Sequence, residues 1–534
     1  MTVPENKTVP ENKTVPEDKT VPEDKTVPED ETVPEDKTVP DDQGARPRVD
    51  VRRLRGARVL VLGAGVSGPG VVRILHALAA RPVVADSRPE AVARLRAALP
   101  GGVDCADIDL DRAAELIGSA DAPGAIDLVV TSPGWRPDSP LLLRAARAGI
   151  AVWGDVELAW RADDAALFGP RRTWLAVTGT NGKTTTTSML EAICLEAGMA
   201  ACACGNIGLP VTDVLLTEPR VDVLAVELSS FQLHWAPSCR PDVGVVLNVA
   251  EDHLDWHGSM AAYAAAKARV LTGGVAVAGV DDERASRLLS AAPAGTRIGV
   301  RVGAPGPGEF GVLDGMLTAR IGDGEGDDDE AALLPAADVR PPGPAGILDA
   351  LAAAAVAMAV GARPEHVASA LRGFTVGAHR AELVDTRGDV RYVDDSKATN
   401  PHAARTSLLS GGRMVWIAGG LLKGADIDPL VAEVAGVLRG VVLIGRDRAR
   451  IAEALSRHAP TVPVVELASG DDDGVADPDE PQETMDRAVA EAARMATGGD
   501  TVLLAPAAAS MDMFTDYGHR GRSFVLAVGR AAGR

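Results

Sequence analysis

The chain has 534 residues, enough for about three to four domains, and its 46% hydrophobic and 24% charged residues are typical of a protein that buries a core. Its 54 lysines and arginines against 75 aspartates and glutamates give a formal net charge of −21, which makes nucleic acid and anionic membrane surfaces poor partners. The five cysteines form no CxxC pair and do not indicate a disulfide framework, so we expect a reducing, cytoplasmic location, with no export leader and no membrane insertion.

Residues 2–43 consist of seven hexapeptides of the type Thr-Val-Pro-Glu-Asp-Lys. A proline at every sixth position forbids a continuous helix, and one valine per repeat buries too little surface to offset the entropy of ordering. We therefore expect residues 1–49 to be a disordered tail. The net charge of the repeats is −8, so the rest of the chain stays acidic without them, and a solvated extension is the preferred interpretation.

Residues 50–161 alternate β-branched runs with helical stretches, a pattern typical of parallel sheets covered by helices. We expect strands at 58–62, 83–86, 126–130 and 150–153 and a helix at 69–80. Gly63, Gly65 and Gly68 form a GxGxxG pattern directly after the first strand, and Asp86 ends the next strand. This loop and this acid suit a pyrophosphate and a ribose, so an NAD-dependent dehydrogenase and a protein that binds a UDP-sugar both stay open.

Residues 162–376 form the second expected unit, with strands at 174–177, 221–226 and 243–247. The segment Thr178-Gly-Thr-Asn-Gly-Lys-Thr-Thr185 leads from a strand into a helix that begins near Thr184. Its glycines let backbone N–H groups approach phosphate, Lys183 supplies a cation and Thr184 can bind Mg²⁺. These features predict an ATP site, although the spacing is shorter than in the general P-loop. Glu227 follows the strand at 221–226, where a carboxylate can hold Mg²⁺.

Residues 377–534 form the third expected unit, with strands at 414–418, 441–444 and 501–504. Two polar stretches, 322–330 and 469–481, are interpreted as mobile surface insertions. The most apolar helix candidate, 347–361, is too short to span a bilayer comfortably. The expected fold class is α/β, in three domains that follow the disordered tail.

Seven motifs in this order resemble the signature of the Mur ligase family, at residues 178–185, 205–208, 227–233, 248–253, 379–380, 395–400 and 505–510. The resemblance covers about residues 55–530. It implies an N-terminal Rossmann-like domain that binds UDP, a central P-loop ATPase domain, and a C-terminal Rossmann-like domain that closes on ATP. The run Leu-Ser-Ser-Phe-Gln-Leu at 228–233 indicates the member of the family that adds D-glutamate.

The resemblance implies an ATP-dependent ligase of cytoplasmic peptidoglycan precursor synthesis, acting as a monomer with ATP and two Mg²⁺ sites. The γ-phosphoryl group of ATP would move to the carboxylate of UDP-N-acetylmuramoyl-L-alanine, and the amine of D-glutamate would attack the resulting acyl phosphate. Another amino-acid ligase of the same family stays an alternative. So does an inactive binding protein, although such proteins usually lose the loop lysine or the metal ligands.

The resemblance also implies roles for individual residues. The implied catalytic residues are Lys183, His253, Lys267 and Lys423. The implied metal ligands are Thr184, Glu227, His253 and Lys267, the last of them as a carbamate. The implied nucleotide contacts are Gly179, Thr180, Asn181, Gly182, Lys183, Thr184, Thr185, Arg380, Asp395 and Lys397. The implied substrate contacts are Val66, Ser67, Asp86, Ser87, Ser132, Asn206, Ser229, Lys423, Ser510 and Tyr517, of which Lys423, Ser510 and Tyr517 would bind D-glutamate.

The chain departs from the family pattern at residues 345–349 and at Tyr517. Many members have a Gly-x-His-Asn stretch with another Asn three residues later, but here Ala345 and Gly346 replace the His and the first Asn, and Asp349 replaces the second Asn. Tyr517 stands where many relatives have Phe. A separate pattern, His253 and His257 at i and i+4, could bind zinc, but no Glu follows the first His, so a zinc hydrolase is disfavoured.

Overall fold

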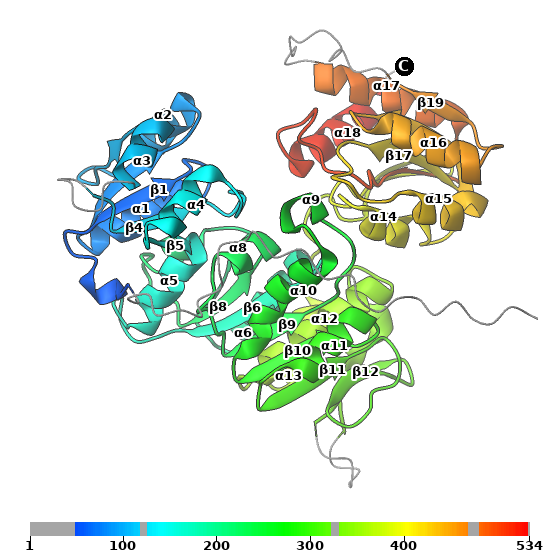
Figure 1. Ribbon diagram of the computed structural model, residues 1–534. Helices are drawn as coiled ribbons and strands as arrows, with labels where there is room; N and C mark the ends of the chain where they lie inside the picture. The colour runs from blue at the N-terminus through cyan, green and yellow to red at the C-terminus, as the bar shows by residue number, and fades with distance from the viewer. Residues whose placement is uncertain (1–48, 118–124, 322–329, 468–479, 532–534) are drawn as a thin grey trace, which may run out of the picture.

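The computed structural model describes residues 49–117, 125–321, 330–467 and 480–531, and three sheets divide them into three α/β units (Figure 1). The expected α/β class is thereby confirmed. In Figure 1 the first unit, in blue and cyan, and the third unit, in yellow to red, lie on either side of the central green unit. The predicted tail, except for its last residue, lies outside the described residues.

The N-terminal unit is a five-stranded parallel sheet with the strand order β3-β2-β1-β4-β5. The order turns back between β1 and β4, which is where open α/β sheets bind ligands at the carboxyl ends of their strands. The predicted helix at 69–80 ends at Ala77, because Ala79 adopts a left-handed backbone with φ +57°. The elements are β1 (Arg58–Leu62), α1 (Gly68–Ala77), β2 (Arg81–Ala85), α2 (Pro89–Ala97), β3 (Ala106–Asp107), α3 (Leu110–Ile117), β4 (Leu128–Thr131), α4 (Pro140–Arg147), β5 (Ala151–Gly154) and α5 (Asp155–Asp164), after the 3-10 helix η1 (Val51–Arg53).

The central unit is a nine-stranded sheet with the order β14-β13-β12-β11-β10-β9-β6-β8-β7. It is parallel except at β12, β13 and β14, which pair antiparallel. Its elements are β6 (Thr173–Thr178), α6 (Lys183–Glu196), β7 (Ala201–Gly205), α7 (Val211–Val214), β8 (Val223–Glu227), α8 (Ser230–His234), β9 (Val243–Val246), α9 (Leu254–His257), α10 (Met260–Ala268), β10 (Val275–Gly279), α11 (Glu283–Ala291), β11 (Thr296–Val300), β12 (Glu309–Leu313), β13 (Met316–Arg320), β14 (Glu330–Pro335), α12 (Pro344–Met358) and α13 (Pro364–Arg372).

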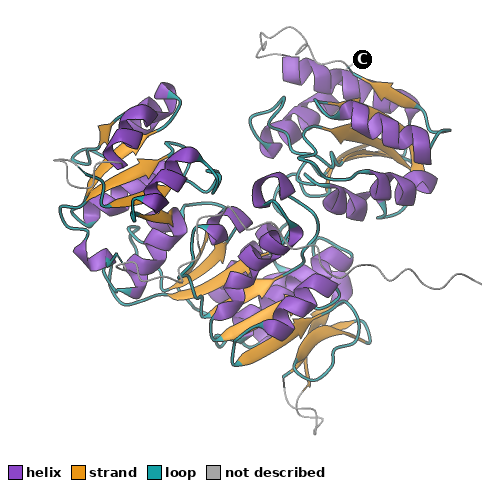
Figure 2. Ribbon diagram, viewed as in Figure 1, coloured by secondary structure: helices purple, strands orange, loops and turns teal. Residues whose placement is uncertain are grey.

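The C-terminal unit is a six-stranded sheet with the order β15-β16-β20-β17-β18-β19, parallel except between β15 and β16 (Figure 2). β17 and β20 are buried along their whole length and, apart from Thr501, carry no polar side chain, as expected of central strands covered on both faces. The elements are β15 (Glu382–Arg387), β16 (Val390–Asp394), α14 (Pro401–Leu408), β17 (Met414–Gly419), α15 (Asp428–Val434), β18 (Leu438–Ile444), α16 (Arg448–His458), β19 (Val464–Glu466), α17 (Glu480–Met495), β20 (Thr501–Leu504) and α18 (Tyr517–Ala531).

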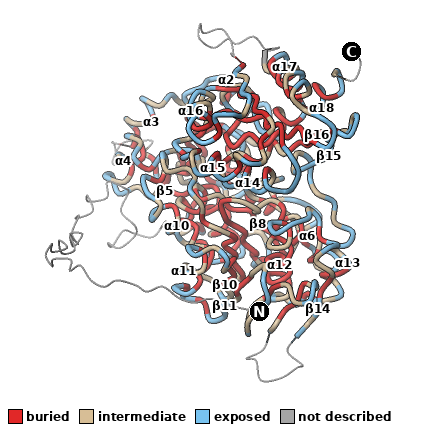
Figure 3. The backbone as a smooth tube through the Cα atoms, turned by 90° about the vertical axis from the view of Figure 1, so that its right-hand side faces the viewer, coloured by how far each residue is buried: buried red, intermediate tan, exposed pale blue. Residues whose placement is uncertain are grey.

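One hydrophobic cluster joins the first two units, because its buried side chains run from Val51 to Ala294 and come from both sheets. An ion pair between Arg73 on α1 and Asp213 on α7, with a nitrogen–oxygen distance of 2.7 Å, crosses the same boundary. The two clusters of the third unit contain only buried residues between 390 and 528. Figure 3 shows the buried segments, in red, in the interior. The third unit therefore has a core of its own.

The segments predicted as mobile insertions lie mostly outside the described residues. The last residues of both segments are in regular structure and not in a loop as predicted. Glu330 is the first residue of β14, and residues 480 and 481 are the first residues of α17. Most of the apolar candidate at 347–361 lies in the buried helix α12, which ends at Met358. Among the described residues, no helix is both long and apolar enough to cross a bilayer. The expected boundaries at 161 and 376 stay predictions, and α5 runs through the first of them.

Candidate active site

The predicted phosphate loop, residues 178–185, joins the carboxyl end of β6 to the amino end of α6. Gly182 has a left-handed backbone with φ +85°, and a Cβ atom there would lie 2.2 Å from Oδ1 of Asp349 on α12. The loop is held to the end of β9 by two hydrogen bonds, from the backbone N–H of Asn181 to Asn248 Oδ1 (2.9 Å) and from the N–H of Thr180 to the Asn248 carbonyl (3.0 Å). The chain thus requires glycine at 182 and fixes the loop against two neighbouring elements.

Two lysines share one carbonyl group of this loop. Lys183 Nζ donates to the carbonyl oxygens of Gly179 and Thr180, both at 2.9 Å, and Lys267 Nζ donates to Gly179 O at 2.7 Å. The Lys267 side chain is buried, with Nζ 4.5 Å from the centre of the Tyr263 ring. Burial lowers the pKa of Lys183, and burial together with the charge of Lys183 holds the pKa of Lys267 well below its ordinary value.

Glu227, at the carboxyl end of β8, has one carboxylate oxygen without a protein partner. Oε1 accepts a hydrogen bond from Asn206 Nδ2 at 2.7 Å, whereas the buried Oε2 has no hydrogen-bond partner among the described residues. The negative charge of Glu227 opposes the lowering of the pKa values of Lys183 and Lys267 that burial causes. An unpartnered carboxylate oxygen beside a phosphate loop fits the oxygen-rich coordination that Mg²⁺ prefers.

His253 lies between the central and C-terminal units. It precedes α9 with φ +56°, its ring centre is 4.6 Å from that of Phe231, and Asp252 Oδ2 is 3.6 Å from its Nε2. Burial first, and then the charges of Lys423 and the loop lysines, lower the pKa of His253 to about 4. The imidazole is therefore neutral at pH 7 and can act as a metal ligand.

The two histidines of the possible zinc pair both lie against the Phe231 ring, with ring centres 4.6 and 5.6 Å from it. His257 Nε2 lies 2.9 Å from Ser230 Oγ, and α9 is only four residues long. Within the described part of the chain, the group of side chains spaced to hold a metal is His379, Glu382 and Asp394 of the C-terminal unit, which contains neither histidine of the pair. Its members already bond to one another, since His379 Nδ1 lies 2.7 Å from Asp394 Oδ2.

Two predicted nucleotide contacts of the C-terminal unit reach the phosphate loop. Lys397 Nζ donates to Thr184 Oγ1 at 3.0 Å and to the Tyr517 hydroxyl at 3.1 Å, and Arg380 bonds to the Thr185 hydroxyl. Burial and the charge of Arg380 lower the pKa of Lys397 to about 8. Asp395 does not reach the loop: its carboxylate accepts bonds from the Ala381 N–H and the Ser407 hydroxyl, and burial raises its pKa to about 6.

Of the three predicted D-glutamate contacts, two lie on paired loops. Leu421 and Ala509 exchange two backbone hydrogen bonds of 2.8 and 2.9 Å, which brings the loop of Lys423 beside that of Ser510. After burial, the charge of Lys423 is one of the causes that lower the pKa of His253, so the loop of Lys423 acts electrostatically on the central unit. Tyr517 instead belongs with Lys397, whose Nζ is 4.4 Å from the centre of the tyrosine ring.

The predicted uridine-nucleotide contacts gather at the carboxyl ends of β1, β2 and β4. Gly63 has φ +102°, and a Cβ atom there would lie 2.3 Å from Ser132 Oγ. Asp86 accepts hydrogen bonds from the Ala64 N–H (2.8 Å) and the Arg88 N–H (2.9 Å); despite burial, these bonds lower the pKa of Asp86. Of the other predicted contacts, Val66 and Ser87 are exposed and Ser67 is half-buried.

Two of the predicted substrate contacts make bonds within the central unit. Asn206 bonds to Glu227, as described above, and Ser229 caps α8 by accepting a hydrogen bond from the Gln232 N–H at 3.1 Å. Sequence reasoning assigned no role to Asn248, Asn400 and His402, although all three contact Asn181. The position of Asn248 after a strand that adjoins β6 is a signal that could have identified it.

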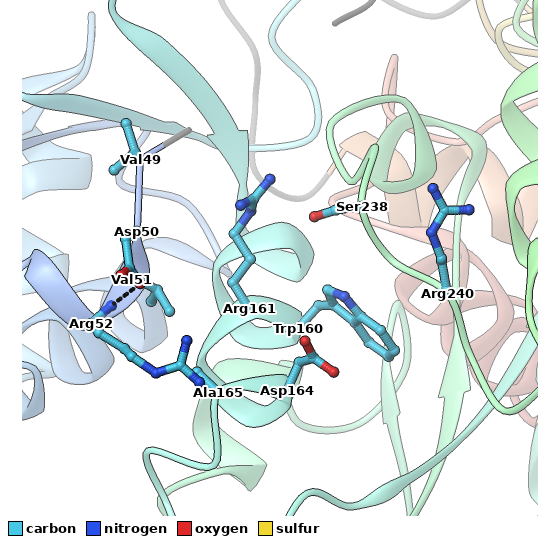
Figure 4. Close-up of a pocket in the computed structure, with 10 residues that line it drawn as sticks. All are labelled: Val49, Asp50, Val51, Arg52, Trp160, Arg161, Asp164, Ala165, Ser238 and Arg240. Atoms are coloured by element: carbon cyan, nitrogen blue, oxygen red, sulfur yellow. Dashed lines mark hydrogen bonds between the residues drawn. The ribbon is translucent and has the colours of Figure 1, made fainter. Parts of the chain in front are cut away.

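A pocket of about 510 Å³ lies elsewhere, between η1, α5 and residues 238–240 (Figure 4). Arg52, Arg161 and Arg240 line it, and none of the predicted site residues does. The candidate active site is therefore defined by the loop contacts above and not by this pocket.

Comparison with known proteins agrees with the arrangement of units. A sequence profile described as the Mur ligase middle domain matches residues 177–303, and one described as the Mur ligase glutamate ligase domain matches residues 379–508. The chain is 55% identical to the UDP-N-acetylmuramoylalanine--D-glutamate ligase of Rhodococcus jostii (strain RHA1), over 89% of this chain and 96% of that protein. It is also 55% identical to the ligase of the same name from Nocardia farcinica (strain IFM 10152), over 89% and 97%.

A solved structure shares the fold. The pseudomurein peptide ligase type C from Methanothermus fervidus aligns with a TM-score of 0.54 at 17% identity, over 88% of this chain and 99% of that chain.

Proposed function

The chain belongs to the Mur ligase family, and we propose that it joins D-glutamate to UDP-N-acetylmuramoyl-L-alanine in an ATP-dependent step of peptidoglycan precursor synthesis. The observation that carries this choice is the 55% identity to two ligases named for that reaction, over 96% and 97% of their lengths. A dehydrogenase explains the GxGxxG loop but gives no role to the lysine-bearing loop and the unpartnered oxygen of Glu227.

The first chemical task is to turn a carboxylate into an electrophile, which phosphorylation by ATP achieves. Lys183, Lys397 and Arg380 place three cationic side chains at the loop that receives the triphosphate. Lys183 exchanges its two carbonyl partners for phosphate oxygens, because an anionic acceptor forms the stronger hydrogen bond. Positive charge held at the transferred phosphoryl group stabilises the transition state, and this is the main source of catalysis in phosphoryl transfer.

The second task is to deliver the amine of D-glutamate to the acyl phosphate. The charge of Lys423 acts on His253 of the central unit, and the pairing of Leu421 with Ala509 sets Ser510 beside the loop of Lys423. A cation and a hydroxyl on these paired loops suit the two carboxylates of a dicarboxylic amino acid. This arrangement supports binding of D-glutamate by the C-terminal unit.

Thr184, Glu227 and His253 are the side chains that would hold Mg²⁺, which when bound supplies Lewis-acid stabilisation of phosphoryl oxygens. The unpartnered Glu227 Oε2 supports one such site. A second site would need an anionic oxygen from Lys267, which carbamylation provides. Lys267 is buried and its hydrogen bond goes to the carbonyl of Gly179, so its amine can stay neutral, as reaction with CO₂ requires. Incorporation of label from [¹³C]bicarbonate, lost in Lys267→Met, tests this.

We place the reaction in a reducing cytoplasm, which the five free cysteines, four of them buried, support. The active site as built needs residues of one chain only, which supports a monomer. Sedimentation of the full chain tests the oligomeric state.

The decisive assay measures ATP-dependent phosphate release with UDP-N-acetylmuramoyl-L-alanine against a panel of amino acids. We expect release with D-glutamate alone. A preference for another amino acid would move the chain elsewhere in the family, and tight NAD binding without any effect of the UDP-sugar would favour a dehydrogenase. Lys183→Ala should abolish release while the far-UV circular dichroism stays unchanged, and full activity in that variant would refute the loop assignment.

A further inference from the structure

The side chain of Asn181, in the phosphate loop, is held by two residues of the C-terminal unit. Asn400 Nδ2 donates to Asn181 Oδ1 at 3.0 Å, and Asn181 Nδ2 lies 3.4 Å from Asn400 Oδ1 and 2.9 Å from His402 Nδ1. Both partners stand at the start of α14, Asn400 as its cap and His402 in its first turn. One polar side chain therefore connects the loop that binds phosphate to the unit that closes over it.

The orientation of this cluster follows from the helix cap. Asn400 Oδ1 accepts a hydrogen bond from the Ala403 N–H at 2.9 Å, so this oxygen is the acceptor and Nδ2 is the donor. Asn181 must then present its oxygen to Asn400 Nδ2 and its amide nitrogen to His402. The ring atom that meets a donor has to be an acceptor, so Nδ1 of His402 carries no proton and the imidazole is neutral.

The surroundings of His402 favour this neutral form. Partial desolvation at the boundary between the units lowers its pKa, and the charge of Arg405 on α14 lowers it further. The Asp282 carboxylate, before α11, acts in the opposite direction but is already fixed by bonds from the Val249 N–H (3.2 Å) and the Ala285 N–H (2.8 Å). An imidazolium at position 402 would set an N–H group against the Asn181 amide and break the contact.

We propose that His402 is a positioning residue, which with Asn400 clamps the Asn181 amide and so couples closure of the C-terminal unit to the geometry of the phosphate loop. It acts through its contact with Asn181. The inference rests on the proposed function, since it assumes that ATP occupies the loop. It predicts that ATP is bound best when His402 is neutral and the clamp is formed.

The kinetic test compares His402→Ala, which removes the acceptor, with His402→Gln, which restores one as an amide oxygen. The Michaelis constant for ATP should rise about fivefold in His402→Ala, the fold-change of one net hydrogen bond, and return to within about twofold in His402→Gln. The turnover number and the Michaelis constant for the UDP-sugar should change little. His76→Ala, an exposed histidine on α1, is the control for loss of a surface imidazole.

The dependence of the Michaelis constant for ATP on pH is a second test, because a purely structural role of His402 would not change it. The Michaelis constant for ATP of the wild type should rise as the pH falls below the ordinary histidine value of about 6.5, and His402→Gln should lack this added rise. In the double variant Asn181→Ala/His402→Ala, the increase in the Michaelis constant for ATP should equal the increase in Asn181→Ala alone. The clamp would be refuted if the effects of the two single substitutions on the Michaelis constant multiplied in the double variant. It would also be refuted if His402→Ala and His402→Gln had the same Michaelis constant for ATP.

Hydrogen–deuterium exchange of the full chain without ligand separates failure of this inference from failure of the proposed function. His402→Ala should speed exchange in the peptide that contains residues 178–184, whereas His402→Gln and His76→Ala should not. An unchanged exchange rate in that peptide would refute the clamp even if D-glutamate supports phosphate release. Faster exchange in a protein that releases no phosphate would keep the clamp and remove only the assigned reaction.

Discussion

Gly182 is the position at which one added methyl group should disable the phosphate loop. Its φ of +85° lies in the left-handed region, where an alanine costs about 1–2 kcal/mol. The added Cβ would also lie 2.2 Å from Asp349 Oδ1 and 3.0 Å from Leu247 Cδ1. Asp349 can move away only by giving up its 3.1 Å hydrogen bond from the Thr186 hydroxyl, and its carboxyl is buried.

The magnitude follows from those two contributions. Displacing a buried carboxyl from its hydrogen bond costs about 1–3 kcal/mol, so with the backbone contribution Gly182→Ala should lose about 2–5 kcal/mol of unfolding free energy. Gly198, past the other end of α6, is a matched control with φ +77° and no atom within 4 Å of an added Cβ. Gly198→Ala should therefore lose only the backbone contribution of about 1–2 kcal/mol.

Urea unfolding followed by circular dichroism measures the two losses, and phosphate release measures activity. Gly182→Ala should be inactive, whereas Gly198→Ala should keep wild-type turnover. In Gly182→Ala/Asp349→Ala the close contact is removed, and about 1 kcal/mol or more of the loss should be recovered. Equal destabilisation of Gly182→Ala and Gly198→Ala would refute the reasoning from the Asp349 contact.

Three further substitutions test the electrostatics of the site. Glu227→Gln should keep the bond from Asn206 and the fold but lower phosphate release more than about 100-fold, with a higher Mg²⁺ requirement; undiminished Mg²⁺ dependence and rate would exclude a metal at Oε2. Lys397→Met should be inactive yet more stable than wild type at pH 7. Because the folded pKa of Lys397 is lowered to about 8, its charge destabilises the fold below that pH, so the gain should vanish as the pH rises from about 8 to 10.4 in urea titrations. The pKa of His257 is lowered to about 3, mainly by burial, so between pH 3 and 6.5 the unfolded chain binds more protons than the folded chain. The free energy of unfolding therefore decreases as the pH is lowered from about 6.5 to 3. His257→Gln should weaken this dependence on pH, and an unchanged slope would contradict the reasoning.

Much of the fold could be predicted because hydrophobic periodicity marks strands that are buried on both faces. The runs at 58–62 and 501–504 coincide with β1 and β20 as observed. Helix ends were less predictable, because they depend on backbone conformations that any residue can be forced to adopt, such as the positive φ of Ala79 that follows α1. The strands β12, β13 and β14 were not predicted, and neither were the parallel strands β7, β10 and β11, so the missed strands are not confined to the antiparallel edge of the sheet.

The site could be predicted where a motif carries its own chemistry and not where the partner comes from a distant segment. Lys183 and Glu227 are recognisable by their places after β6 and at the end of β8. The cap of α14 by Asn400 and its contact with Asn181 join residues that are far apart in sequence, and local patterns hold no information on such a pair. Asp349 was noticed only as a departure from a family pattern, whereas its contact with Gly182 needed the fold.

The distribution of apolar side chains decides which part of the molecule can move freely. The hydrophobic cluster from Val51 to Ala294 runs through the first two units, so rotation of one unit against the other would expose apolar side chains to water. The clusters of the third unit stop at its own borders, and polar groups such as Lys397 and Thr184 meet across its edge. Water can replace those partners at little free-energy difference, so the apolar contacts that oppose movement between the first two units do not oppose movement of the third unit.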